Sequence, residues 1–185
     1  MKNKKKFFVY TFVKRERLIV KIDTTYMSIS PGEKIPKFFS VDEKGNEYSQ
    51  DTFLGHWLLL YFYPKDDTPG CTKEACSFRD SWSQLRDQNI FVLGVSAQSA
   101  CSHQKFVEKY SLPFPLLVDE EKKLATLFGA WGEKTFLGKK YKGMKRISFL
   151  VDPEGMIVKI YEVTNTGKHA ENVLYDVERF LLKKK

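Results

Sequence analysis

The sequence predicts an α/β protein in which a central mixed β-sheet is flanked by helices on both faces. Two short runs of consecutive apolar residues, 57–63 and 90–95, are typical of strands that are buried on both faces of a sheet. A stretch with helical spacing of apolar residues follows each run, at 71–87 and 101–110. A hairpin and a final helix come after this strand–helix–strand–helix unit, so we expect a mixed sheet rather than a wholly parallel one.

The chain has 185 residues, which suits one domain with enough length to bury a sizeable core. Its hydrophobic content of 42% and aromatic content of 15% argue against intrinsic disorder. No apolar run approaches the roughly 18 residues that a membrane-spanning helix needs. Because the sequence contains neither an internal repeat nor a second-domain linker, we expect residues 27–185 to form a single domain.

The first half of this domain is expected to lead from a hairpin into a buried strand. Two prolines in 31–36 favour an extended entry, and 41–48 has the pattern of a hairpin that turns near Gly45. The buried strand ends at Pro64, and the loop 65–70 leads from it into the first helix.

The second half is expected to contain a short strand, a short helix, a glycine- and lysine-rich loop, a hairpin and a last amphipathic helix. In that order, these elements are predicted at 116–118, 122–128, 129–143, 147–161 and 170–182. The sequence Asp-Pro-Glu-Gly at 152–155 has the composition of a turn and divides the hairpin into two strands.

The formal net charge of +8 is carried by the two ends of the chain. Residues 1–26 contain eight cations and two anions, and 183–185 add three lysines, so residues 27–182 carry a net charge of −1. A nucleic-acid-binding domain would carry its positive charge on the folded body. We therefore expect neither a nucleic-acid nor a membrane partner for the domain.

Residues 1–26 form a basic N-terminal extension that we do not expect to belong to the core. Its lysines and the apolar run 7–13 imitate a signal peptide, but the run is at the lower length limit and no small-residue cleavage site follows. A targeting segment is one interpretation. We favour the other, that the segment is appended or follows an early start codon, with Met27 as the functional start.

The chain contains three cysteines, Cys71, Cys76 and Cys101. An odd and sparse set does not fit the disulfide framework of a small secreted domain. A structural zinc site usually needs four ligands in paired spacings, and three cysteines with three scattered histidines do not supply them. The sequence therefore predicts reactive thiols in a reducing, cytoplasmic setting and no structural zinc site.

Cys71 occupies a position that favours a reactive thiolate. A strand ends before it, the prolines at 64 and 69 stiffen the loop, and the predicted helix starts with Cys71 in its first turn. Free amide N–H groups and the helix dipole at such a start favour an anion, and the thiolate is the attacking species in thiol chemistry. Thr68 supplies a hydroxyl three residues earlier. The alternative is a small, buried and inert cysteine at a helix start.

Cys76 lies five residues after Cys71 in the same predicted helix. Ideal helix geometry separates such residues by about 7.5 Å along the axis and about 140° around it. Their Cα atoms are then roughly 8–9 Å apart, beyond the limit of about 7 Å for a disulfide. Either the two cysteines never pair, or the first turn and a half of the helix must unwind before they do.

Residues 61–76, YFYPKDDTPGCTKEAC, closely resemble the active-site segment of the bacterioferritin comigratory protein/PrxQ branch of the peroxiredoxins. The family motif Pro-x-x-x-Thr-x-x-Cys is complete in Pro64, Thr68 and Cys71. Further similar segments lie at 94–96, 102–106, 112–117, 131–134 and 146–152. The resemblance spans roughly 31–173, and residues 1–26 have no counterpart in it.

The resemblance implies a thioredoxin-like fold with an N-terminal β-hairpin extension. It also implies a thiol peroxidase that uses no metal, haem or other cofactor and reduces hydrogen peroxide and organic hydroperoxides. Because the partner cysteine would be intramolecular, a dimer is unnecessary and we expect a monomer. In this scheme Cys71 is the peroxidatic cysteine and becomes a sulfenic acid, and Cys76 resolves it as an intramolecular disulfide that thioredoxin or a similar dithiol protein reduces. Thr68 hydrogen-bonds the peroxide and the thiolate, Arg146 stabilises the thiolate and orients the peroxide, and Pro64 shields the sulfur.

The remaining candidates are expected to have structural roles. Cys101 is more simply explained as structural than as resolving, although it is the first alternative to Cys76. His56 and His169 are expected at the surface, and His103 matches the family pattern without a mechanistic role that we can assign. A dithiol–disulfide exchange protein is the alternative function. The absence of a Cys-x-x-Cys motif and the presence of Thr68 argue against it.

Overall fold

The computed structural model describes residues 29–136 and 138–183. The basic segment 1–26 lies outside the described residues. Among the described residues, no helix is long and apolar enough to cross a membrane.

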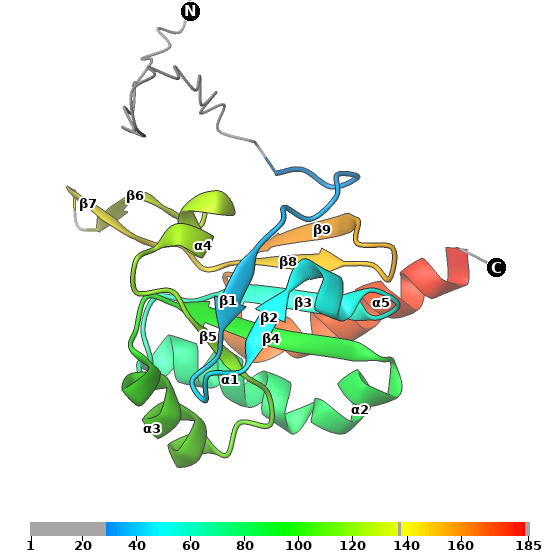
Figure 1. Ribbon diagram of the computed structural model, residues 1–185, viewed down its shortest axis with the longest axis horizontal. Coiled ribbons are helices and arrows are strands. Elements are labelled where there is room, and N and C mark those ends of the chain that lie inside the picture. Colours follow the sequence, from blue (N-terminus) through cyan, green and yellow to red (C-terminus); the bar gives the residue numbers. More distant parts are fainter. Residues whose placement is uncertain (1–28, 137, 184–185) are drawn as a thin grey trace, which may run out of the picture.

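A five-stranded mixed sheet forms the centre of the molecule (Figure 1). Its strands, in the order β5-β4-β3-β8-β9, are Leu116–Val118, Ile90–Ser96, Trp57–Phe62, Ile147–Val151 and Ile157–Glu162. The strands β3, β4 and β5 run parallel, whereas β8 is antiparallel to both β3 and β9. The predicted mixed sheet is therefore confirmed.

The central strand β3 divides the core into two layers. Trp57, Leu59 and Tyr61 pack toward α1, α2, α3 and α5, and the alternate residues Leu58 and Leu60 pack toward α4 and the N-terminal hairpin. Every residue of β3 is buried, which explains why its sequence is apolar throughout rather than alternating. Figure 1 shows α1, α2 and α3 on one side of the sheet and α4 on the other.

The remaining elements surround this sheet. The N-terminal hairpin consists of β1 and β2, followed by the short helix η1, at Phe39–Val41, Glu47–Ser49 and Gln50–Phe53. The helices α1 to α5 span Pro69–Asp80, Trp82–Asp87, Ala100–Tyr110, Lys123–Leu127 and His169–Lys183. The short helix η2 at Thr166–Lys168 precedes α5, and the strands β6 and β7 lie at Trp131–Phe136 and Lys139–Met144.

Two predicted elements differ from the structure. The helix expected over 71–87 is broken at Ser81, whose φ of −97° and ψ of 11° end α1 and begin α2. The loop expected over 129–143 is instead the antiparallel pair β6 and β7, which form a two-stranded sheet of their own. Gly138, with a φ of 77°, lies in the turn and takes a backbone conformation that favours glycine.

Candidate active site

The predicted nucleophile Cys71 lies in the first turn of α1, at the carboxyl end of β3. Thr68 is the N-cap residue and Pro69 the first helical residue, so Cys71 is the third. At this position backbone N–H groups have no intrahelical partner, and the helix dipole favours a negative charge. The side chain of Cys71 belongs to the buried core, with only 2% of the residue exposed.

Arg146, just before β8, lies against Cys71 although 75 residues separate them in the sequence. Its Nη2 donates to Cys71 Sγ at 3.3 Å, and its Nη1 forms an ion pair with Glu74 Oε2. Gly70 leaves room for this approach, because a Cβ at that position would lie 3.3 Å from Arg146 Nη2. The fold thus brings together the two residues that sequence similarity associates with peroxide chemistry.

Glu74 links the guanidinium to a histidine on another helix. Its side chain is completely buried, and its second oxygen, Oε1, lies 2.9 Å from His169 Nδ1. Burial alone would lower the pKa of Arg146, but the charges of Glu74 and Cys71 outweigh it and raise that pKa above its usual value. Arg146 therefore remains a cation beside the thiol.

The expectation that His169 lies at the surface is wrong. His169 is buried because α5 begins at this residue and its ring packs between Phe78 and Tyr161, with ring centroids at 5.0 Å and 5.3 Å. A histidine just ahead of an amphipathic helix has the sequence pattern of a polar boundary residue. Neither it nor Glu74 could be identified as part of the site without the fold.

Thr68 and Pro64 line the loop that leads to Cys71, and both are half-buried. The Thr68 hydroxyl donates to the Lys65 carbonyl oxygen at 3.0 Å and, within the described chain, makes no capping bond to α1. Because its proton is used in this way, the hydroxyl presents its remaining lone pairs as acceptors.

A second buried carboxylate fixes the same loop to α3. Asp66 accepts hydrogen bonds from Tyr63 Oη at 2.7 Å, from Ser102 Oγ at 2.6 Å and from His103 Nδ1 at 2.9 Å. Burial acts to raise the pKa of Asp66, but these hydrogen bonds lower it by more than burial raises it. The pKa of Asp66 is therefore below its usual value. His103, to which the sequence assigned no role, thus helps to hold the loop between Pro64 and Thr68.

The other two cysteines, Cys76 and Cys101, are more exposed than Cys71. Cys71, Cys76 and Cys101 are all free thiols. Cys76 is half-buried on α1, beyond Glu74, and Cys101 is exposed in the first turn of α3. The helix α1 is continuous from Pro69 to Asp80, so Cys71 and Cys76 lie five residues apart on one unbroken helix. At that spacing we expect their Cα atoms to be too far apart for a disulfide.

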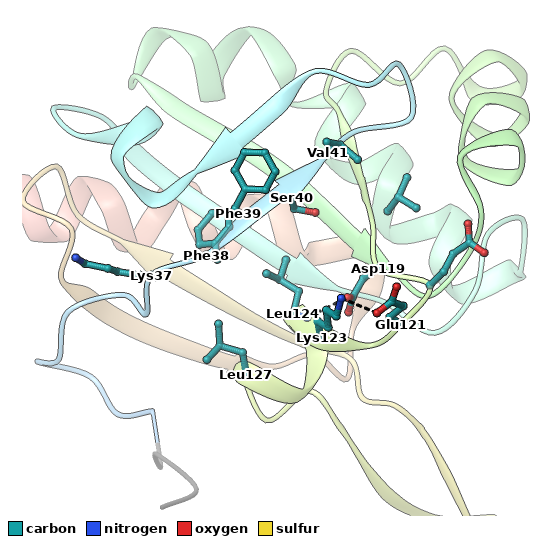
Figure 2. A pocket seen from close by; sticks show the side chains of 12 residues that line it. Lys37, Phe38, Phe39, Ser40, Val41, Asp119, Glu121, Lys123, Leu124 and Leu127 are labelled. Carbon is teal, nitrogen blue, oxygen red and sulfur yellow. Dashed lines mark hydrogen bonds and ion pairs between the residues drawn. The ribbon is translucent and has the colours of Figure 1, made fainter. Parts of the chain in front are cut away.

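Two further features lie outside this arrangement. A groove of about 480 Å³ lies between β1 and α4, and Figure 2 shows Phe39, Val41 and Leu124 among the side chains that line it, with the ion pair of Lys123 and Glu121. None of its lining residues is a predicted site residue. Within 29–136 and 138–183, no group of three or more His, Cys, Asp or Glu side chains is arranged to hold a metal ion.

Comparison with known proteins gives consistent matches. A sequence model of the AhpC/TSA family matches residues 31–160. The chain is 42% identical over 148 residues to Peroxiredoxin Bcp of Bacillus subtilis, covering 80% of this chain and 94% of that protein. A bcp peroxiredoxin of Coxiella burnetii is 46% identical over 148 residues, which cover 80% of this chain and 98% of that protein.

Solved structures match in the same way. A trapped intermediate/ligand complex of the bacterioferritin comigratory protein of Xanthomonas campestris has a TM-score of 0.73 at 34% identity, covering 77% of this chain and 91% of that one. A cysteine-to-serine mutant of PrxQ from Xylella fastidiosa has a TM-score of 0.77 at 30% identity, covering 83% of this chain and 98% of that one.

Proposed function

The chain belongs to the AhpC/TSA family as a peroxiredoxin of the Bcp/PrxQ type, a thiol peroxidase, and we propose that Cys71 is the cysteine with which it attacks peroxides. Its central mixed sheet flanked by helices is the thioredoxin-like fold of these peroxiredoxins. The observation that carries the assignment is the contact of 3.3 Å between Arg146 Nη2 and Cys71 Sγ.

In the first step the Cys71 thiolate attacks one oxygen of the peroxide. A sulfur–oxygen bond forms, the oxygen–oxygen bond breaks, and the leaving oxygen takes up a proton and departs as water or an alcohol. The sulfur is oxidised to a sulfenic acid. Hydrogen peroxide and organic hydroperoxides are the proposed substrates; the Xanthomonas campestris relative is described by its alkyl peroxide reduction activity.

Three groups around the sulfur have proposed roles in this step. Arg146 donates a charge-assisted hydrogen bond to the thiolate sulfur. Its positive charge also stabilises the negative charge that develops on the leaving oxygen. Thr68 accepts a hydrogen bond from the peroxide O–H, because its own proton is bonded to the Lys65 carbonyl oxygen. Pro64, at the start of the loop, shields the thiolate from solvent.

The second step is assigned to Cys76. Its thiol attacks the sulfenic acid, the sulfur–sulfur bond forms and water leaves, which makes this an atypical two-cysteine enzyme with an intramolecular disulfide. The residues between the two cysteines must unwind first, because both lie on one continuous helix. A thioredoxin-type dithiol then reduces the disulfide by exchange and becomes a disulfide itself.

The remaining expectations about the chain stay proposals. An intramolecular resolving cysteine makes a second subunit unnecessary, so we propose a monomer that has neither a nucleic-acid nor a membrane partner. Reactive free thiols suit a reducing compartment, so we propose a cytoplasmic enzyme. The catalytic domain is proposed to start near Met27.

Substitution of each cysteine tests the scheme. Peroxide consumption is followed with thioredoxin, thioredoxin reductase and NADPH. Cys71→Ser should abolish turnover, and Cys76→Ser should consume one equivalent of peroxide and then stall or become over-oxidised. Cys101→Ser is the matched control and should turn over normally. Normal turnover in Cys76→Ser would reassign the resolving role, with Cys101 next to be tested, and normal turnover in Cys71→Ser would refute the proposal.

The unwinding is tested by circular dichroism. The oxidised protein, with a 71–76 disulfide proven by peptide mapping, should have less helix than the reduced protein. Unchanged helix content in the presence of that disulfide would contradict the proposed opening of α1.

A further inference from the structure

Glu74 lies between the two cysteines of α1, three residues after Cys71 and two before Cys76. Its carboxylate is completely buried, and each oxygen has its own partner, Arg146 on one side and His169 on the other. A buried carboxylate is costly unless it is paired. The helical position of Glu74 is therefore maintained by partners that come from two other parts of the fold.

His169 is fixed in the orientation that Glu74 requires. Because an ionised carboxylate only accepts hydrogen bonds, His169 Nδ1 is the donor in the contact of 2.9 Å. Its ring lies against Phe78 from α1 and Tyr161 from β9, and its Nε2 is buried without a partner among the described residues. Among the described residues, Glu74 is thus the hydrogen-bond partner of the His169 side chain.

The segment that carries His169 also holds the residue next to Glu74. In η2, Gly167 packs so closely against Lys73 that an added Cβ would lie 2.5 Å from Lys73 Cε. The two residues at 73 and 74 are therefore both contacted by the short segment 167–169, and they lie within the stretch that joins Cys71 to Cys76.

We propose that His169 is a positioning residue that holds Glu74 in the helix and, through Glu74, holds Arg146 on the sulfur of Cys71. The inference rests on the proposed function. The same contacts must break before residues 71–76 can unwind, because unwinding withdraws Glu74 from both of its partners. His169 therefore accelerates the attack of Cys71 on the peroxide and slows the later formation of the disulfide with Cys76.

His169→Phe separates the hydrogen bond from the packing. Phenylalanine keeps an aromatic ring beside Phe78 and Tyr161 but removes the donor to Glu74. A hydrogen bond to a charged group is strong enough that its loss changes a rate by about tenfold or more. We expect the peroxide step to slow by about tenfold and the disulfide step to accelerate by a similar factor.

The two steps are measured separately by rapid mixing with hydrogen peroxide, quenching and mass spectrometry, which counts the thiol, the dimedone-trapped sulfenic acid and the disulfide. The pH profile of Cys71 alkylation by iodoacetamide is the independent readout. In His169→Phe the thiolate fraction at a given pH should fall, because Arg146 is less firmly held. A merely structural role would lower thermal stability without moving this profile or changing the two rates in opposite directions.

Two further variants control the experiment. His56→Phe makes the same change at a histidine whose Nδ1 bonds Asn89 Oδ1 at 2.7 Å, near the opposite end of β3, and it should leave both rates unchanged. His169→Asn restores an N–H donor near the position of Nδ1 and should recover part of the peroxide rate. Should His169→Phe not fold, Glu74→Gln removes the carboxylate charge and predicts the same opposite changes.

The proposal is overturned if the folded variant keeps the wild-type peroxide rate and alkylation profile, or if its disulfide step does not accelerate. Failure of the proposed function is seen separately, in the wild type alone. It would show as no peroxide consumption, or as consumption that does not depend on Cys71.

Discussion

Arg146 provides a sharp test of the active site, because one guanidinium serves two partners. Its Nη1 pairs with Glu74 and its Nη2 lies 3.3 Å from Cys71 Sγ. Lysine retains the charge but has a single nitrogen, which cannot occupy both positions. In Arg146→Lys we expect the ammonium to stay near the buried Glu74 carboxylate, because that group requires a partner, and to lose the contact with the sulfur.

The size of the effect follows from this geometry. Two unit charges at 3.3 Å interact by about 5 kcal/mol at an effective dielectric constant of about 20. The Arg146 side chain is 19% exposed, so solvent screens part of this energy. A hydrogen bond to a charged group contributes about 1.5–3 kcal/mol net. At about 1.4 kcal/mol per factor of ten, its loss predicts about a 10- to 150-fold lower rate constant for peroxide reduction.

A double variant separates catalysis from stability. Arg146→Met leaves Glu74 buried with one partner fewer and should lower the free energy of unfolding by about 3–5 kcal/mol. Adding Glu74→Gln removes the uncompensated charge and should recover most of that stability without recovering activity. The assays are single-turnover peroxide reduction and urea denaturation. A peroxide rate within twofold of wild type in Arg146→Lys, or a recovered rate in the double variant, would refute the reasoning.

Three other substitutions test the surroundings of the site. Gly70→Ala places a Cβ 3.3 Å from Arg146 Nη2, so the guanidinium must shift, and single-turnover peroxide reduction should slow by about threefold. Gly94→Ala places a Cβ 2.5 Å from Leu116 Cδ2, and this overpacking should lower the free energy of unfolding in urea by about 1–3 kcal/mol. Because the pKa of Asp66 is lowered in the fold, its ionised form stabilises the protein above about pH 4, and this contribution is lost as the pH falls through the lowered value. Asp66→Asn should therefore cost about 3 kcal/mol at pH 7, measured by urea denaturation, and progressively less below about pH 4.

Each of these substitutions has a contrary outcome. An unchanged peroxide rate in Gly70→Ala would mean that Arg146 can move without consequence. Wild-type stability of Gly94→Ala would mean that the core between β3 and β5 can accommodate an extra methyl group. For Asp66→Asn the matched control is Asp87→Asn, at an exposed carboxylate at the end of α2, and a stability difference that does not shrink in acid would contradict the linkage argument.

The central sheet could be predicted because strands that are buried on both faces have continuous apolar runs in the sequence. The strands β3 and β4 are nearly continuous apolar runs, and both were located to within one residue. The strands β6 and β7 were missed because they pair only with each other, and β7 is exposed at Lys139–Lys142. A strand without a buried face has no periodicity that distinguishes it from a loop.

The same distinction holds for the site: residues close together in the sequence could be predicted, and residues that only the fold brings together could not be predicted from local sequence. Pro64, Thr68 and Cys71 belong to one loop and one helix start, so the local sequence favoured a reactive thiol at Cys71, and the family resemblance supplied the peroxide chemistry. Arg146 was identified through family resemblance, because no local pattern connects residues 75 positions apart. His169 was misplaced for a physical reason: its burial depends on how α5 packs against α1, which is a property of the tertiary structure.

The buried charges around Glu74 are better explained by geometry than by stability. A buried ion pair is often no more stabilising than apolar residues of similar volume. An apolar residue in place of Glu74 could therefore hold α1 against the core equally well. An apolar side chain at position 74 could not hold a guanidinium 3.3 Å from the sulfur. Because Glu74 has both of its partners outside α1, the proposed unwinding of 71–76 would break both contacts together. In the proposed scheme, the arrangement that orients Arg146 for the peroxide step is the same one that the disulfide step must give up, so the two steps could not be optimised independently.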